Sequence, residues 1–111
     1  MPSRAPRHEA TEKREQLSRR KEALVRAIRT RQSQEKVLLA AEKYRTANLS
    51  FLKAKLYWAN EELIVAGRGV SKLEAEAASV TVKSNIERLE TEIASWSGKS
   101  AEDVLRESAL A

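Results

Sequence analysis

The sequence predicts an all-α protein: an antiparallel, coiled-coil-like helical hairpin with a long overhanging N-terminal helix and a short C-terminal helix. Three observations lead to this prediction. Both prolines, Pro2 and Pro6, stand at the N-terminus, and the three glycines stand in two short breaks, at 67–69 and at 98. The sequence between these breaks has helical periodicity. The chain is 33% charged but only 5% aromatic, which is typical of long helices and not of a thick globular core.

The breaks divide one domain into four segments. In chain order they are a disordered lead at residues 1–8, a basic helical arm at 9–36, the helical hairpin at 37–96 with its turn at 67–70, and a short C-terminal helix at 97–111. The lead holds both prolines and has no periodicity, as expected of irregular chain.

The first helix is expected to run from about Glu9 to Ala66, because this stretch contains neither glycine nor proline. A continuous helix of that length would span about 85 Å. The polar run at residues 31–36 interrupts its apolar pattern and is compatible with a kink.

The basic helical arm, residues 9–36, has the pattern of a solvated helix. Acid-to-base pairs four residues apart stabilise it, namely Glu9/Lys13, Glu15/Arg19 and Glu22/Arg26. Its apolar stripe is thin and consists of Leu17, Leu24 and Ile28. Because the second helix is too short to reach the arm, we expect the arm to project without a partner in the chain.

The rest of the first helix, residues 37–66, carries two apolar stripes on adjacent faces. The first has the alternating spacing of a coiled coil and comprises Leu49, Leu52, Leu56, Ala59, Leu63 and Ala66. The second is spaced by sevens and comprises Val37, Tyr44, Phe51, Trp58 and Val65. So wide an apolar surface packs against more than one neighbour. We therefore expect part of the second stripe to contact another chain.

The hairpin turn is marked by a stop signal and a start signal four residues apart. Gly67 is expected to end the first helix in the left-handed conformation. Ser71 and Glu74 form a capping-box pattern that starts the next helix. This spacing is usual for an antiparallel helical hairpin.

The second helix of the hairpin, about residues 72–96, has one apolar stripe with 4–3 spacing. Its members are Val82, Ile86, Leu89, Ile93 and Trp96. Folded back on the first helix, this stripe should place Ile86 near Phe51 and Trp96 near Ala41. After Gly98, the run from Ser100 to Asp103 resembles another helix start, with acids in the first turn.

The sequence contains no pattern that predicts catalysis, a cofactor or a metal. The chain has no cysteine and a single histidine, His8, whereas metal sites need several converging ligands. The carboxylate pairs Glu61/Glu62 and Glu87/Glu90 lack the pocket that would shift a pKa for acid–base work. We therefore expect a non-enzymatic protein with no catalytic, cofactor-binding or metal-binding residues.

The expected function is that of a structural or adaptor subunit, which assembles by coiled-coil packing into a larger protein complex. A hetero-complex is preferred over a homo-oligomer. The predicted protein interface consists of Val37, Tyr44, Phe51, Trp58, Val65, Leu49, Leu56, Leu63, Val82, Ile86, Leu89, Ile93 and Trp96. Exposed aromatic and aliphatic stripes of this kind mark protein interfaces.

The alternative is a nucleic-acid-associated factor that contacts the phosphate backbone through the arm. Residues 1–36 hold 11 Lys and Arg against five Glu, a net charge of +6, and the rest of the chain has a net charge of −1. The candidate contacts are Arg19, Arg20, Lys21, Arg26, Arg29 and Arg31. The interleaved acids and the lack of an aromatic side chain for base stacking make this alternative weaker.

The expected location is intracellular, in the cytoplasm or the nucleus. The N-terminus has no apolar core of a secretory signal. No apolar run approaches the roughly 20 residues that span a bilayer, so we expect no membrane span and no secretion.

Overall fold

The computed structural model describes the backbone of residues 6–110 and the side chains of residues 10–109. Four helices make up this part of the chain: α1 (Pro6–Arg29), α2 (Gln34–Ala66), α3 (Lys72–Ser97) and α4 (Ala101–Leu110). The described residues contain no strand. The predicted all-α class is confirmed.

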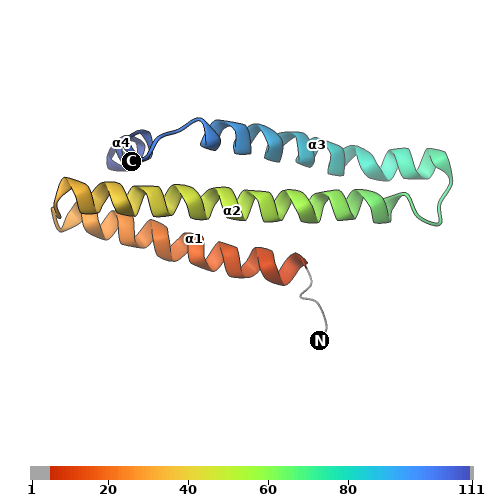
Figure 1. The fold of residues 1–111 in the computed structure, drawn as a ribbon. Coiled ribbons are helices and arrows are strands. Elements are labelled where there is room, and N and C mark those ends of the chain that lie inside the picture. The colour runs from red at the N-terminus through yellow and green to blue at the C-terminus, as the bar shows by residue number, and fades with distance from the viewer. Residues whose placement is uncertain (1–5, 111) are drawn as a thin grey trace.

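Helix α2 is the centre of the molecule, with α1 along one side and α3 along the other (Figure 1). Helix α4 packs against the first half of α2. The molecule measures 59 × 33 × 18 Å. Within the described residues, helix α2 packs against both α1 and α3, and α1 and α3 have no comparable contact with each other. The three long helices therefore form a plate.

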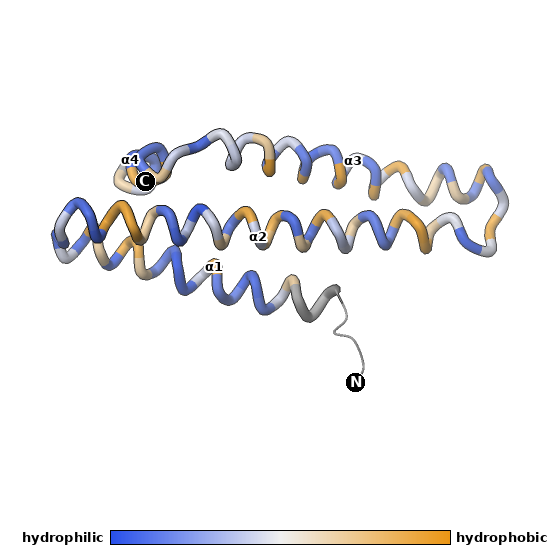
Figure 2. The backbone as a smooth tube through the Cα atoms, viewed as in Figure 1, coloured by the Kyte–Doolittle hydropathy of each residue, from blue (hydrophilic) through white to orange (hydrophobic). Residues whose placement is uncertain are grey.

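Two clusters of buried side chains hold the plate together. The first lies where α1, α2 and α4 meet and consists of Leu24, Ala27, Val37, Ala41 and Val104. The second lies between α2 and α3 and consists of Leu52, Ala59, Ile86 and Leu89. Trp96, near the end of α3, packs against both clusters. Figure 2 shows the hydrophobic positions of α3 on the turns that face α2.

The expected single helix from Glu9 to Ala66 is broken at residues 30–33. Arg31 has a positive φ of 51°. Its N–H donates to the Ile28 carbonyl at 3.2 Å, and the Gln32 N–H donates to the Ala27 carbonyl at 3.1 Å. This is the Schellman motif, with arginine at the left-handed position that glycine usually occupies. Ser33 then caps α2 by accepting a hydrogen bond from the Lys36 N–H at 3.4 Å.

Because of this break, the predicted overhang is wrong. Helix α1 turns back and packs along α2, where Leu24 is fully buried. The Lys13 ammonium donates to the Ser50 hydroxyl at 2.6 Å, near the other end of the contact. The apolar stripe of α1, which consists of Leu17, Leu24 and Ile28, is thin. It is enough to hold α1 against α2, because the second stripe of α2 offers it an apolar surface. Burial of that surface offsets the roughly 1 kcal/mol that a left-handed non-glycine residue costs.

Replacing Arg31 with glycine is expected to stabilise the fold by up to about 1 kcal/mol. Glycine removes the steric cost of the positive φ, although part of the gain is lost to the larger entropy of the unfolded chain. Gln32→Gly is the matched control, since it adds the same flexibility at a residue without positive φ. Chemical denaturation of the three proteins tests this, and a destabilised Arg31→Gly variant would contradict the left-handed assignment.

The turn between α2 and α3 differs in one detail from its expected form. Gly67 is right-handed, with φ −86° and ψ −7°, and the left-handed residue is Gly69, with φ 73°. The chain leaves α2 through a tighter turn, in which the Gly67 N–H donates to the Ile64 carbonyl. Ser71 caps α3 as expected, accepting a hydrogen bond from the Glu74 N–H at 3.2 Å.

Helix α4 begins with a reciprocal cap. The Asp103 N–H donates to the Ser100 hydroxyl at 3.1 Å, and the Ser100 N–H donates to the Asp103 carboxylate at 3.0 Å. These hydrogen bonds favour the ionised carboxylate and lower the pKa of Asp103. No helix in the described part of the chain is long and apolar enough to cross a membrane.

Candidate functional site

The first apolar stripe of α2 faces α3 and is used within the chain. Leu52 is buried against Ile86 and Leu89, and the half-buried side chains of the predicted interface pack around them: Leu56, Leu63, Val82, Ile93 and Trp96. Leu49 is also half-buried. These residues form the contact between two helices of one chain, so they leave little apolar surface for a partner.

The second stripe of α2 contacts α1 at its N-terminal end. Val37 is buried in the cluster that contains Leu24 of α1. Tyr44, Phe51 and Trp58 are half-buried. Val65, the last member, lies beyond the reach of α1 and is 60% exposed. The expectation that the stripe has no partner within the chain is therefore wrong at Val37, which packs in one cluster with Leu24 of α1.

Tyr44 and Trp96 join the two clusters through an aromatic contact. Their ring centroids are 5.6 Å apart and the rings are inclined by 74°, an edge-to-face pair. Trp96 also packs against the cluster that holds Ala41, the neighbour expected for it. Burial raises the pKa of the Tyr44 hydroxyl, and the nearby Lys99 ammonium opposes that shift.

Arg45 fixes the connection between α3 and α4. Its Nε donates to the Lys99 carbonyl at 2.6 Å, and its Nη2 donates to the Ser97 carbonyl at 3.3 Å. The Lys99 ammonium lies 4.4 Å from the centroid of the Trp96 ring and pairs with the Glu107 carboxylate at 3.0 Å. These contacts hold α4 in place beside the end of α3.

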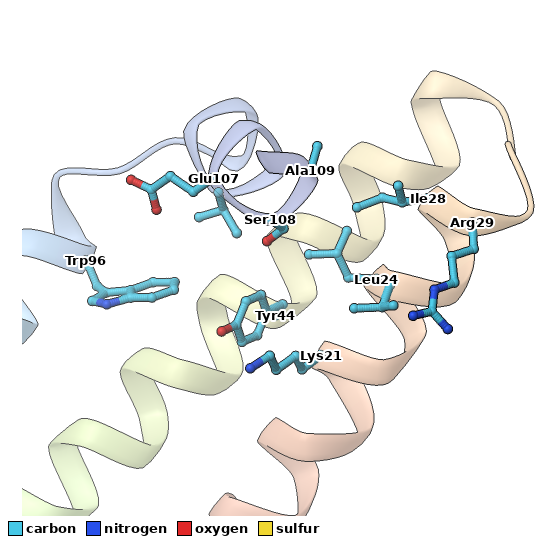
Figure 3. Close-up of a pocket in the computed structure, with 11 residues that line it drawn as sticks. Lys21, Leu24, Ile28, Arg29, Tyr44, Trp96, Glu107, Ser108 and Ala109 are labelled. Carbon is cyan, nitrogen blue, oxygen red and sulfur yellow. The ribbon is translucent and has the colours of Figure 1, made fainter. Parts of the chain in front are cut away.

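A groove of about 530 Å³ opens where α1, α4 and the end of α3 converge on α2 (Figure 3). It is lined by Lys21, Leu24, Val25, Ile28, Arg29, Tyr44, Trp96, Val104, Glu107, Ser108 and Ala109. Leu24 and Val104 form its floor, since both are almost fully buried. Tyr44 and Lys21 lie toward one end, and Arg29 lies toward the other (Figure 3).

The candidate phosphate-binding cations do not form a single patch. Lys21 and Arg29 line the groove, whereas Arg20 is half-buried beside α2. Arg31 lies in the loop after α1. The remaining two, Arg19 and Arg26, are exposed on α1. Lys21, Arg26 and Arg29 also line a second, shallow depression on α1, whereas Arg19 and Arg20 lie apart from it.

Several large apolar side chains are exposed in and near the α2–α3 turn, at one end of the plate. We call this end the apex and define it by Ile64, Val65, Val70, Leu73 and Val80, which are 52%, 60%, 44%, 77% and 65% exposed. Neither α1 nor α4 covers it (Figure 1). By helical spacing, Leu73 and Val80 lie on the side of α3 opposite to its buried stripe.

Sequence reasoning included Val65 in the predicted interface but missed the other four residues of the apex. The sequence nevertheless contains a pattern that predicts the exposure of two of these residues. Leu73 and Val80 are seven residues apart and lie outside the Val82–Trp96 stripe, so a single buried face cannot accommodate both sets. Val70 follows the turn glycines, where an apolar side chain has few neighbours.

The described residues contain no group of three or more His, Cys, Asp or Glu side chains that could hold a metal ion. Packing accounts for the raised pKa of Tyr44, and helix capping accounts for the lowered pKa of Asp103. Comparison of the chain with protein-family models, with curated proteins and with solved structures finds no match.

Proposed function

We propose that this protein is a non-enzymatic structural or adaptor subunit that assembles with other protein chains by helix packing, with the apex as its contact surface. The observation that carries this function is the exposure of five aliphatic side chains at one end of the plate. Full burial of one such side chain is worth about 1.5–3 kcal/mol. Leu73 and Val80 share one side of α3, so a partner on that side would recover part of that free energy for both.

The coiled-coil-like hairpin of α2 and α3 is the scaffold in this function. The faces of α2 and α3 that point toward each other are filled by the side chains of these two helices. The surfaces that the scaffold offers a partner are therefore its end and its outer face. Glu74, Arg68 and Lys72 are exposed around the apex and give it a polar rim. An apolar centre with a polar rim is the usual anatomy of a protein interface.

The test is to replace Leu73 and Val80 together with lysine and to identify by quantitative mass spectrometry what the tagged chain retains from its own cells. We expect proteins retained by the parent chain to be lost from this variant. Leu39→Lys is the matched control, because Leu39 is 56% exposed on α2 and is not part of the apex. A photo-crosslinker at position 73 then establishes direct contact.

If the apex variant retains the same proteins as the control, the apex is not the contact surface. Sedimentation of the purified chain separates the homo-oligomer from the hetero-complex. Self-association that depends on concentration and disappears in the Leu73→Lys, Val80→Lys variant would show that the partner is a second copy.

The alternative function, contact of α1 with a nucleic-acid backbone, is favoured by one observation. Arg19, Arg26 and Arg29 are exposed and form no side-chain hydrogen bond or ion pair within the described residues. Binding to duplex DNA over a salt series, with the triple Arg→Gln variant for comparison, tests it. Affinity should fall with added salt, and the variant should reduce that slope.

A further inference from the structure

The groove between α1 and α4 has the size of a small-molecule site. Its volume of about 530 Å³ lies within the range of about 300–1,000 Å³ usual for ligand sites. The groove also differs from the apex in being concave and in having charged residues along its length.

One wall of the groove is a single ridge of α1 with a cation at each end. Lys21, Val25 and Arg29 follow one another at intervals of four residues, so they lie along one side of the helix. Eight residues correspond to about 12 Å along the axis. Leu24 and Ile28 lie beneath this ridge and make the interior apolar.

The electrostatics of the groove favour an anion. Neither Lys21 nor Arg29 forms a side-chain hydrogen bond or ion pair within the described residues. The one carboxylate of the lining, Glu107, is already paired with Lys99 at 3.0 Å. The Tyr44 hydroxyl lies toward the same end as Lys21 (Figure 3) and adds a hydrogen-bond donor beside that ammonium.

We propose that this groove binds a medium-chain alkyl carboxylate. The carboxylate accepts hydrogen bonds from Lys21 and Tyr44, and the alkyl chain lies along Val25 and Ile28 toward Ala109. Arg29 lies at the far end and limits the length of the chain that fits. This site is separate from the apex, so its occupancy does not depend on the proposed subunit function.

The test uses decanoate, below the concentration at which it forms micelles, with the full chain. Isothermal titration gives the affinity, and the indole N–H signal of Trp96 in a proton–nitrogen correlation spectrum locates the site. Lys21→Gln is expected to weaken decanoate binding about tenfold, the effect of losing a charge-assisted hydrogen bond. Octanoate, which is two methylenes shorter, should bind up to about fifteenfold more weakly, since each fully buried methylene is worth about a fourfold change in affinity.

Arg19→Gln is the matched control, because it removes the same charge from α1 at a residue that does not line the groove. Both residues are exposed, so neither variant should alter folding. Equal weakening by the two variants would overturn the proposal, as would decanol binding as tightly as decanoate. Shifts confined to Val70 and Leu73 would also overturn it, because the ligand would then occupy the apex.

Discussion

Replacing Leu24 with alanine is expected to lower the free energy of unfolding by about 2–5 kcal/mol, the usual cost of emptying a buried leucine site. Leu24 is fully buried, in contact with the cluster formed by α1, α2 and α4. Its neighbours come from three helices, so the cavity cannot close by a small shift of any one of them. The same substitution on a projecting helix would change stability by only a few tenths of a kcal/mol.

The control for this experiment is Leu39→Ala, which removes the same atoms from a leucine that is 56% exposed. We expect it to cost less than about 1 kcal/mol. Urea denaturation followed by circular dichroism measures both variants. Amide exchange should also be faster in α1 and α4 of the Leu24→Ala variant than in the part of α3 near the apex. Similar stabilities of the two variants would mean that α1 does not dock on α2.

The helical class could be predicted because it depends on local information. The glycines, Pro6 and the capping residues Ser71 and Ser100 act over a few residues, and each lies at or beside a helix boundary in the structure. The break after α1 could not be predicted in this way. Its left-handed residue is Arg31, and arginine has no preference for that conformation.

That break is decided by tertiary packing. A continuous helix would leave Leu24 and Val37 in water, whereas the break lets them bury each other at a cost of about 1 kcal/mol. The groove depends on the same event. It exists because α1 returns beside α4.

The second large effect is expected at Leu89, which is 1% exposed in the cluster between α2 and α3. Leu89→Ala should also cost about 2–5 kcal/mol. Leu73→Ala, on the same helix but at a side chain that is 77% exposed, is the matched control and should cost far less. Thermal unfolding of both variants measures the difference.

The combination of Leu24→Ala with Leu89→Ala tests whether the plate unfolds as one unit. The two residues belong to different clusters, and Trp96 packs against both. Direct coupling between such separated sites is small, so the two costs should add within about 0.5 kcal/mol if unfolding remains two-state. If instead the α2–α3 hairpin is stable alone, Leu24→Ala will produce two separate transitions, and Leu89→Ala will shift only the second. Coincident unfolding curves from circular dichroism and tryptophan fluorescence would exclude that outcome.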